Sequence, residues 1–308
     1  MVSYNTLIRI HRFLVKFMIF FGLIMLVTGM AMKFNLDPGI FRLIHFQTST
    51  FFAPIFSLML LTGTLMYFYP KFTRHNNSWK VKLLAKKTVA RETMEFTFEK
   101  PRGFSFIPGQ HLEWLELNPP ETDAEGENRT FTISSAPFEK NLAFTTRMRD
   151  TAYKRVLKNL SRGDEIQISG LEGDFVLPTN QLTSHPIVML AGGIGITPFR
   201  SMLVQNAHDK TNQEIYLFYS NHKIEDTAFL EELTDLAKKH SWLHLFPIFT
   251  DKSGYLKAEA IKKALKNFRA ALYFISGPPQ MVLSTKEMLT SSLKISPNSI
   301  LTDNFTGY

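Results

Sequence analysis

The chain has 308 residues, a length that allows about two ordinary domains. It contains no cysteine, which excludes disulfides, thiolate zinc sites, a catalytic thiol and an iron–sulfur cluster held by this chain. Residues 1–91 carry 12 Lys/Arg and one acid, a charge of +11, whereas residues 92–308 carry 23 Lys/Arg and 26 Asp/Glu, a charge of −3. Because the excess basicity is confined to the first part, the composition does not favour a nucleic-acid-binding protein.

Two long apolar stretches predict a transmembrane hairpin over residues 1–75. Residues 13–32 are apolar apart from Lys16 and Thr28, and residues 46–69 carry no charge. Each stretch is close to the ~20 residues that a helix needs to cross a bilayer. A second span follows the first, which also lacks a small-residue cleavage site, so the first is not a signal peptide. Basic residues flank the hairpin on its outer ends, and the positive-inside rule then predicts a two-pass inner-membrane protein whose N-terminus and remaining domains are cytoplasmic.

The two stretches look duplicated at an offset of 34 residues. Ile10-His11 recurs as Ile44-His45, and Thr28-Gly29 recurs as Thr62-Gly63. In antiparallel helices the two histidines would lie roughly 30 Å apart, so one chain cannot clamp one haem between them.

Three roles for the hairpin remain open. The default is an anchor among membrane lipids, and a quinone pocket near His11 or His45 is the second. The third is haem b, because the Ile-His repeat resembles the His-bearing helices of membrane ferric reductases. It is the least favoured, since it would need a homodimer that pairs each histidine with its counterpart.

Residues 79–180 predict a small antiparallel β-barrel. Short alternating segments are separated by Gly, Pro, Asp and Asn turns, and one helix is expected at 153–160. The expected strands are residues 94–98, 112–117, 129–134, 142–147 and 165–169.

Residues 184–308 predict a doubly wound α/β domain with a parallel sheet. An apolar strand at 187–191 precedes a glycine-rich turn, and strands at 215–220, 243–249 and 272–276 alternate with helices. The sequence therefore predicts a multi-domain chain of two transmembrane helices, an antiparallel barrel and an α/β nucleotide-binding domain.

The glycine-rich turn Gly192–Pro198 lies where the first parallel strand ends and a helix begins. Glycines let a backbone approach a pyrophosphate, and the helix start offers free N–H groups. We expect Thr197 to cap this helix and Pro198 to occupy its first turn.

In the barrel, Arg129-Thr130-Phe131-Thr132 places a cation, a ring and hydroxyls on alternating sides of one strand.

Seven motifs in order over residues 79–308 resemble those of the ferredoxin–NADP reductase superfamily. They are Pro108-Gly109-Gln110, Arg129-Thr130-Phe131-Thr132, Arg149-Asp150-Thr151, Gly170–Phe175, Gly192–Pro198, Ser276–Met281 and Asp303–Tyr308. The resemblance implies an FAD-binding barrel followed by an NAD(P)-binding domain, with FAD and NAD(P)H as cofactors and no metal.

The resemblance also implies roles for single residues. Arg129 would neutralise the FAD pyrophosphate, Phe131 would stack on the flavin and Thr132 would hydrogen-bond near flavin N5. Thr132, Ser276, Asp303 and Phe305 would lie at the reacting groups, where hydride passes from nicotinamide to flavin. Further cofactor contacts would come from Thr130, Arg149, Thr151, Gly192, Gly193, Gly195, Thr197, Pro198, Ser220, Gly277, Pro278 and Met281.

This sequence departs from the family pattern at four of these positions. Phe131 replaces the family's Tyr, Thr132 replaces Ser, Ser276 replaces Cys and Asp303 replaces Glu.

Either Phe305 or Tyr308 would cover the flavin face. Ser220 and Lys223 could bind a 2′-phosphate, which slightly favours NADPH over NADH.

The sequence thus predicts a membrane-anchored flavoprotein that passes electrons from NAD(P)H through FAD to a redox protein, a quinone or ferric iron. Two alternatives stay open. One is a transmembrane, haem-containing electron conduit similar to ferric reductases, and the other is a membrane sensor without catalytic activity.

Overall fold

The computed structural model describes residues 4–34, 36, 38–76, 78–178 and 185–305, so Tyr308 lies outside the described part. The chain divides into two units, Met1–Asn77 and Ser78–Tyr308.

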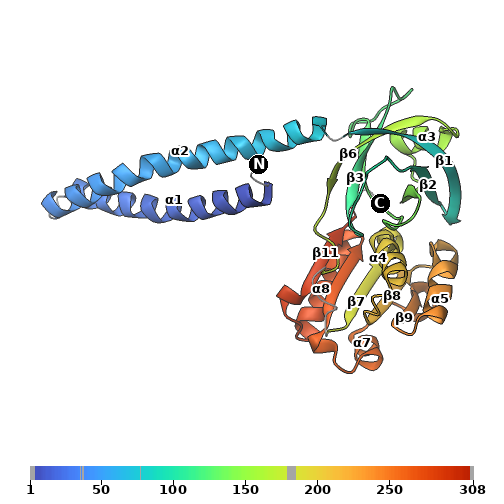
Figure 1. The fold of residues 1–308 in the computed structure, drawn as a ribbon. Coiled ribbons are helices and arrows are strands. Elements are labelled where there is room, and N and C mark those ends of the chain that lie inside the picture. The colour runs from blue at the N-terminus through green and yellow to red at the C-terminus, as the bar shows by residue number, and fades with distance from the viewer. Residues whose placement is uncertain (1–3, 35, 37, 77, 179–184, 306–308) are drawn as a thin grey trace. The chain divides into compact units, whose positions relative to one another are not determined.

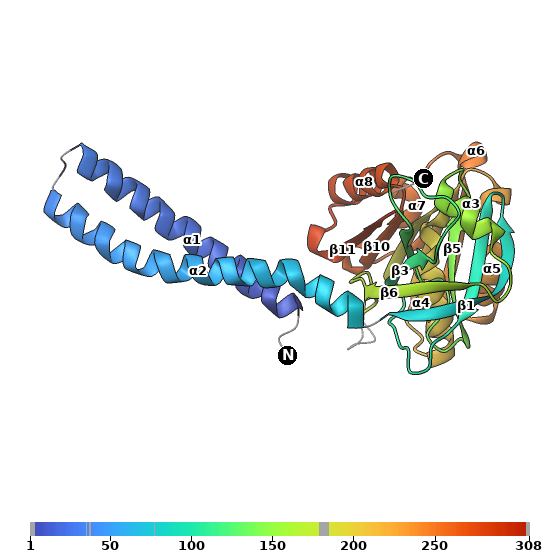
Figure 2. The same ribbon diagram turned by 90° about the horizontal axis from the view of Figure 1, so that it is seen from above.

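The first unit is a helical hairpin. Helices α1 (Tyr4–Lys33) and α2 (Pro38–Asn76) run antiparallel and side by side (Figures 1 and 2). Within them, Ile10–Lys33 and Gly39–Tyr67 are long and apolar enough to span a membrane, with mean hydropathies of 2.2 and 1.6. Large apolar side chains cover the outside, such as Phe13 and Ile19, which are 60% and 68% exposed. Contiguous apolar surface of this kind is unusual on soluble proteins, and the hairpin is compatible with a membrane anchor.

The expected duplication corresponds to two matching contacts across the hairpin. Nδ1 of His11 lies 2.9 Å from Oγ1 of Thr62, and Nδ1 of His45 lies 2.9 Å from Oγ1 of Thr28. Positions 11 and 28 are 17 residues apart on α1. At 1.5 Å per residue the two pairs lie about 25 Å apart, somewhat less than expected.

The first part of the second unit is the predicted antiparallel barrel. Its strands are β1 (Trp79–Ala90), β2 (Thr93–Glu99), β3 (His111–Glu116), β4 (Asn128–Thr132), β5 (Asn141–Arg147) and β6 (Glu165–Glu172), in the order β4-β3-β6-β1-β2-β5. A bridge between Ile133 and Phe144 joins the two outer strands. Helix α3 (Ala152–Asn159) packs Tyr153 and Leu157 into the barrel core.

Strand β1 was not expected from the sequence. It alternates buried Val81 and Leu83 with exposed lysines, but Lys86 and Lys87 are both exposed and interrupt the pattern. A bulge in its pairing with β2 lies just before these two lysines, which explains the break in alternation.

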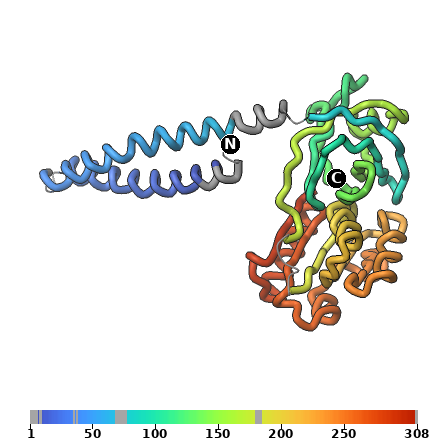
Figure 3. The backbone as a smooth tube through the Cα atoms, viewed as in Figure 1, coloured from blue at the N-terminus to red at the C-terminus, as the bar shows by residue number. Residues whose placement is uncertain are grey.

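The second part is the predicted parallel sheet, traced in Figure 3. Its strands are β7 (Ile187–Gly192), β8 (Ile215–Asn221), β9 (Leu243–Phe249), β10 (Leu272–Gly277) and β11 (Ile300–Asn304), in the order β11-β10-β7-β8-β9. The helices are α4 (Ile196–Asp209), α5 (Leu230–Lys239), α6 (Thr250–Ser253), α7 (Ala258–Ala264) and α8 (Pro279–Glu287). Strand β11 adds an edge to the four expected strands. The chain order reverses between β7 and β10, which makes this the switch point of the sheet.

A buried cation joins the barrel to the α/β domain. Arg200 in α4 forms ion pairs with Glu139 of the barrel at 2.6 Å and with Glu232 of α5 at 2.7 Å. It also donates to the carbonyl oxygen of Ser134 at 3.0 Å. The Arg200 side chain is only 11% exposed, so the two carboxylates depend on it for charge compensation.

Replacing Arg200 should loosen this junction. We expect Arg200→Leu to lower the free energy of unfolding by about 3 kcal/mol, because it leaves Glu139 and Glu232 without their cation. The measurement is the urea unfolding midpoint followed by tryptophan fluorescence. Arg155→Leu is the control, since Arg155 pairs with Glu121 on the surface with its side chain 45% exposed, and it should change the midpoint little. Equal shifts in both variants would contradict the role of Arg200.

Candidate functional site

The motifs of the α/β domain meet at the carboxyl edge of its sheet. The strand register places Gly192 beside Ser220, and Ser276 between Ala191 and Asp303. The ends of β7, β8, β10 and β11 therefore form one row at the switch point, which is where open α/β sheets bind ligands. Residues as far apart in the sequence as Gly192 and Asp303 are brought to the same edge here.

The turn after β7 has one open glycine and one packed glycine. It forms a short 3-10 helix, Gly193–Gly195, ahead of α4. Gly193 has a φ of +54°, and nothing lies within 4 Å of where its Cβ would be. A Cβ on Gly195 would lie 2.3 Å from the carbonyl oxygen of Ser276. Gly193 thus leaves free backbone for a phosphate, while Gly195 lets the turn pack directly on β10.

The expected cap at Thr197 is wrong. Thr197 is fully buried inside the first turn of α4, and its Oγ1 donates to the carbonyl oxygen of Ile194 at 3.1 Å. The cap position is Gly195, because the 3-10 turn moves the start of α4 toward the N-terminus. Pro198 lies in the first turn, as expected.

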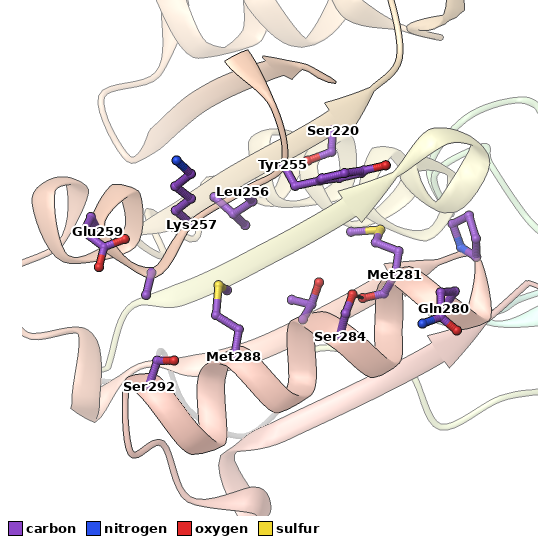
Figure 4. Close-up of a pocket in the computed structure, with 13 residues that line it drawn as sticks. Ser220, Tyr255, Leu256, Lys257, Glu259, Gln280, Met281, Ser284, Met288 and Ser292 are labelled. Carbon is purple, nitrogen blue, oxygen red and sulfur yellow. Dashed lines mark hydrogen bonds between the residues drawn. The ribbon is translucent and has the colours of Figure 1, made fainter. Parts of the chain in front are cut away.

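Two adjoining cavities open at this edge of the sheet. The interdomain cavity, of about 280 Å³, is lined from the barrel by Arg91, Thr93 and Arg147, and from the α/β domain chiefly by Gly192–Ile194 and Ser220–His222. The outer groove, of about 800 Å³, lies between residues 255–259 and α8 (Figure 4). The two spaces adjoin because they share the lining residues Ser220, Tyr255, Pro278 and Met281.

The outer groove offers one aromatic ring, apolar walls and a single lysine. Figure 4 shows Tyr255 near Ser220, with Met281 and Met288 on the opposite wall. The Tyr255 side chain is 83% exposed, and Lys257 lines the groove. A mostly apolar groove with few polar groups suits the adenosine part of a nucleotide.

The structure revises two details of this region. Lys223, the expected partner of a 2′-phosphate, is exposed and is not among the residues that line either cavity. Tyr255 was missed because it lies in a loop without a strong pattern. The available signal was its place shortly after β9, at the same edge of the sheet as the glycine-rich turn.

Ser276 is a buried hydroxyl that lacks a partner. Its side chain is 0% exposed, and its Oγ has no hydrogen-bond partner in the described part of the chain. An unsatisfied buried hydroxyl is costly, so a ligand amide at this edge would relieve it. Ser276 lines neither cavity, so a nicotinamide would reach this hydroxyl only after the residues that cover it move.

Asp303 and Phe305 lie on the same side of the site. Burial raises the pKa of Asp303 above its ordinary value, although His111 acts in the opposite direction. The backbone N–H of Phe305 donates to the carbonyl oxygen of Gly277 at 3.0 Å, which ties the end of the described chain to the turn after β10.

On the barrel side, Arg129 is held by an acidic loop. Its Nη2 lies 2.6 Å from Asp123 and its Nε lies 3.0 Å from Glu125. Its Nη1 donates to the carbonyl oxygens of Gly126 and Asn128 at 2.9 and 2.8 Å. Three hydrogen bonds and two ion pairs therefore occupy the guanidinium, and a phosphate would have to displace a carboxylate or share the guanidinium with it.

Beside Arg129, cations gather at the N-terminus of α3. Thr151 caps this helix by accepting a hydrogen bond from the backbone N–H of Lys154 at 3.3 Å, and the first turn holds no acid. Burial and the charges of Arg149 and Arg129 lower the pKa of Lys154 to about 8. Cations that repel one another at a helix N-terminus are stabilised by an anion, so this place fits the pyrophosphate of FAD.

Phe131 and Thr132 lie on opposite sides of β4. The Phe131 ring is parallel to that of Phe144, with centroids 4.5 Å apart and a 2° angle, and it is half-buried. Only the part of the Phe131 ring that Phe144 does not cover is accessible to a flavin. Thr132 is 6% exposed and pairs with His111 of β3, while Thr130 is exposed.

Comparison with known proteins agrees with this geometry. Residues 189–287 match the protein family described as Oxidoreductase NAD-binding domain. The chain is 28% identical over 262 residues to the glycine betaine monooxygenase reductase subunit of Chromohalobacter salexigens, covering 80% of this chain and 66% of that protein. It is 26% identical over 238 residues to the flavohemoprotein of Bacillus subtilis, covering 72% and 58%.

Among solved structures, ferredoxin-NADP+ reductase from Plasmodium falciparum superposes with a TM-score of 0.65 at 18% identity, over 75% of this chain and 97% of that one. The chain spans about half the length of the first flavohemoproteins it matches.

An antiparallel barrel followed by a parallel sheet with a glycine-rich turn at its switch point defines the class of flavin oxidoreductases that depend on NAD(P)H. The matched family and the shared fold support the resemblance of residues 79–308 to the ferredoxin–NADP reductase superfamily that the seven motifs indicated. Its cofactors, FAD and NAD(P)H, fit the two places described above.

The competition at Arg129 can be tested by FAD affinity. Arg129→Ala should weaken FAD binding by about 10- to 150-fold, because a charge-assisted hydrogen bond contributes ~1.5–3 kcal/mol. Asp123→Asn should instead tighten it, because the substitution removes a competitor of the phosphate. Both are measured by titrating FAD into apoprotein and following flavin fluorescence. If Asp123→Asn weakened binding as Arg129→Ala does, Asp123 would orient Arg129 rather than compete for it.

The FAD affinity should also depend on pH. Burial raises the pKa of Glu116, which is 3% exposed and neighbours Arg129, to about 8. As the pH rises through about 8, Lys154 loses a positive charge and Glu116 gains a negative one, and both changes disfavour a phosphate. The Kd for FAD should therefore rise about tenfold between pH 7 and pH 9. The double variant Lys154→Met/Glu116→Gln should flatten this profile, and a flat profile in the parent would contradict the assignment.

Proposed function

We propose that this protein is a membrane-anchored flavoprotein reductase that takes hydride from NAD(P)H onto FAD and passes electrons to an acceptor outside the chain. The observation that carries the proposal is the interdomain cavity, which places the barrel residues Arg91, Thr93 and Arg147 opposite the glycine-rich turn. A flavin held by the barrel and a nicotinamide held by the sheet would meet in this space.

On the barrel side, the residues at the start of α3 bind the cofactor. When bound, FAD supplies the redox chemistry, and the chain supplies position and charge. Arg149, Thr151 and Lys154 hold the pyrophosphate together with the helix N-terminus. Arg129 contributes once Asp123 yields part of its guanidinium. Phe131, Thr130 and Thr132 contact the flavin from the two sides of β4.

On the sheet side, the carboxyl edge orients the nicotinamide nucleotide. Gly193 would leave space for its phosphates, while Gly192 packs against Met281, whose sulfur a Cβ would overlap. Gly195 with buried Thr197 and Pro198 shapes the turn from behind. Ser276 Oγ would donate to the nicotinamide amide once the residues that cover it move, and Asp303 holds a proton more readily than an exposed carboxylate. Ser220, Pro278 and Met281 line both cavities, next to Gly277, whose carbonyl oxygen accepts from the backbone N–H of Phe305.

The proposed membrane topology follows from the basic residues that flank the two spans. Arg9, Arg12 and Lys16 precede or begin the first span, and seven Lys/Arg follow the second up to residue 91. The positive-inside rule then places the N-terminus and the flavin unit in the cytoplasm, where NAD(P)H is available, with the hairpin in the inner membrane.

The acceptor lies outside the chain in this proposal. The relative from Chromohalobacter is named as the reductase subunit of a monooxygenase. A chain without cysteine holds no iron–sulfur cluster to receive the electrons. The candidate acceptors are therefore a redox protein, a quinone or ferric iron.

The proposed function predicts a yellow protein that NAD(P)H bleaches. Full-length protein in detergent should carry one FAD per chain, and its flavin absorbance should fall when NAD(P)H is added without oxygen. Gly195→Ala should keep FAD but lose bleaching, since its methyl group would lie 2.3 Å from the Ser276 carbonyl oxygen and displace the turn. A protein that stays colourless after reconstitution with FAD would support the non-catalytic sensor. Full bleaching of Gly195→Ala would contradict the nucleotide site.

A further inference from the structure

One ring nitrogen of His11 is engaged inside the hairpin. Oγ1 of Thr62 lies 2.9 Å from Nδ1 of His11 and 3.0 Å from the carbonyl oxygen of Met59, and the tautomer of the ring sets which group donates to which. Thr62 therefore contacts Nδ1, and Nε2 is the ring nitrogen left for a ligand, either as an N–H donor or as a lone-pair acceptor.

The other end of the hairpin repeats the arrangement. Thr28 Oγ1 donates to the carbonyl oxygen of Ile24 at 2.8 Å and lies 2.9 Å from Nδ1 of His45. Nδ1 of His45 is therefore engaged in the same way. The chain thus contains its own matched control for any role of His11.

The His11 ring lies close to the α2 backbone and keeps part of its surface exposed. A Cβ on Gly63 would lie 3.4 Å from Cε1 of His11, so the missing side chain lets the ring lie close to the α2 backbone. The ring is half-buried, and the helix around it exposes large apolar side chains. A titratable nitrogen in an apolar membrane span is costly, and such residues mark sites of function.

We propose that His11 and Thr62 form a binding site for a lipid-soluble quinone, which rests on the proposed function and names its acceptor. The hydroxyl of a hydroquinone donates to the Nε2 lone pair, and the carbonyl of a quinone accepts from Nε2 once it is protonated. A quinone needs one such histidine. A six-coordinate haem iron would need two histidines at the same position along the hairpin. One chain provides His11 at one position and His45 at the other.

Chain connectivity selects the His11 end over the His45 end. Thr62 lies 14 residues before the end of α2 at Asn76, and His45 lies 31 residues before it. At 1.5 Å per residue these are about 21 and 46 Å along the helix. The flavin unit begins at Ser78, so the His11 pair lies at the end of the hairpin joined to that unit.

The overall reaction is NAD(P)H + H+ + quinone → NAD(P)+ + hydroquinone. The quinone gains two electrons and two protons. The hydride of NAD(P)H accounts for both electrons and one proton, and the medium supplies the second proton. His11 passes one proton from Nε2 to a quinone oxygen and regains it from the medium, so it is unchanged after each turnover.

The kinetic test uses full-length protein in detergent with a short-chain ubiquinone as the probe. His11→Ala should raise the KM for quinone at least tenfold, while ferricyanide reduction, which reports the flavin, stays at the parent rate. His45→Ala removes the same kind of interhelical bond at the other end and should leave the KM within twofold of the parent. Equal effects of both variants would mean that His11 only packs the hairpin, and the proposal would be wrong.

A spectroscopic test works without turnover. In protein labelled with 15N-histidine, the His11 signal is assigned by its loss in His11→Ala. It should shift when short-chain hydroquinone is added, whereas the His45 signal should not. Absence of a shift would refute the site even if the enzyme is active, and failure of NAD(P)H to reduce the flavin would refute the proposed function alone. A Soret band lost in both histidine variants would assign the site to haem instead.

Discussion

The packing of Gly195 against β10 is the constraint on which the site depends. Only a hydrogen in place of a side chain lets the turn after β7 approach the Ser276 carbonyl, because a Cβ would come within 2.3 Å. This approach brings the glycine-rich turn and the end of β10 together at the switch point of the sheet. Beside this contact, Gly193 faces open space, and the buried Ser276 hydroxyl has no hydrogen-bond partner among the described residues. The close approach thus brings an open stretch of backbone and an unsatisfied donor to the same edge of the sheet.

In the barrel half of the site, charge rather than close packing is the main constraint. Here the difficulty is an excess of cations: burial first, and then the charges of Arg149 and Arg129, lower the pKa of Lys154 to about 8. The acidic loop compensates part of this charge through Asp123 and Glu125 on Arg129. A bound pyrophosphate would complete the compensation, so cofactor binding and the conformation of the acidic loop are linked through one guanidinium.

Most of the architecture could be predicted from the sequence because its signals are local. Uniformly apolar strands and glycine turns indicated the parallel sheet, and uncharged stretches indicated the hairpin. Strand β1 was missed because adjacent exposed lysines hide its alternation. The cap at Thr197 was wrong because a 3-10 turn shifts the helix start, and such a turn has no distinct pattern in the sequence.

The contacts of the site depend on segments far apart in the chain, and these could not be predicted. Nothing local indicates that Asp123 reaches Arg129, or that Tyr255 meets α8 across a groove. The repeat of His and Thr-Gly did indicate a relation between the helices. However, the pairing of His11 with Thr62 is visible only once the helices are antiparallel and in register.

The central claim is that flavin and nicotinamide meet in the interdomain cavity. A structure of the protein determined with FAD and NADP+ bound tests it most directly. The account predicts the FAD pyrophosphate at the N-terminus of α3, the adenosine of NADP+ against Tyr255 in the outer groove, and the nicotinamide beside Ser276. A pyrophosphate away from α3, or a nucleotide outside both cavities, would contradict it.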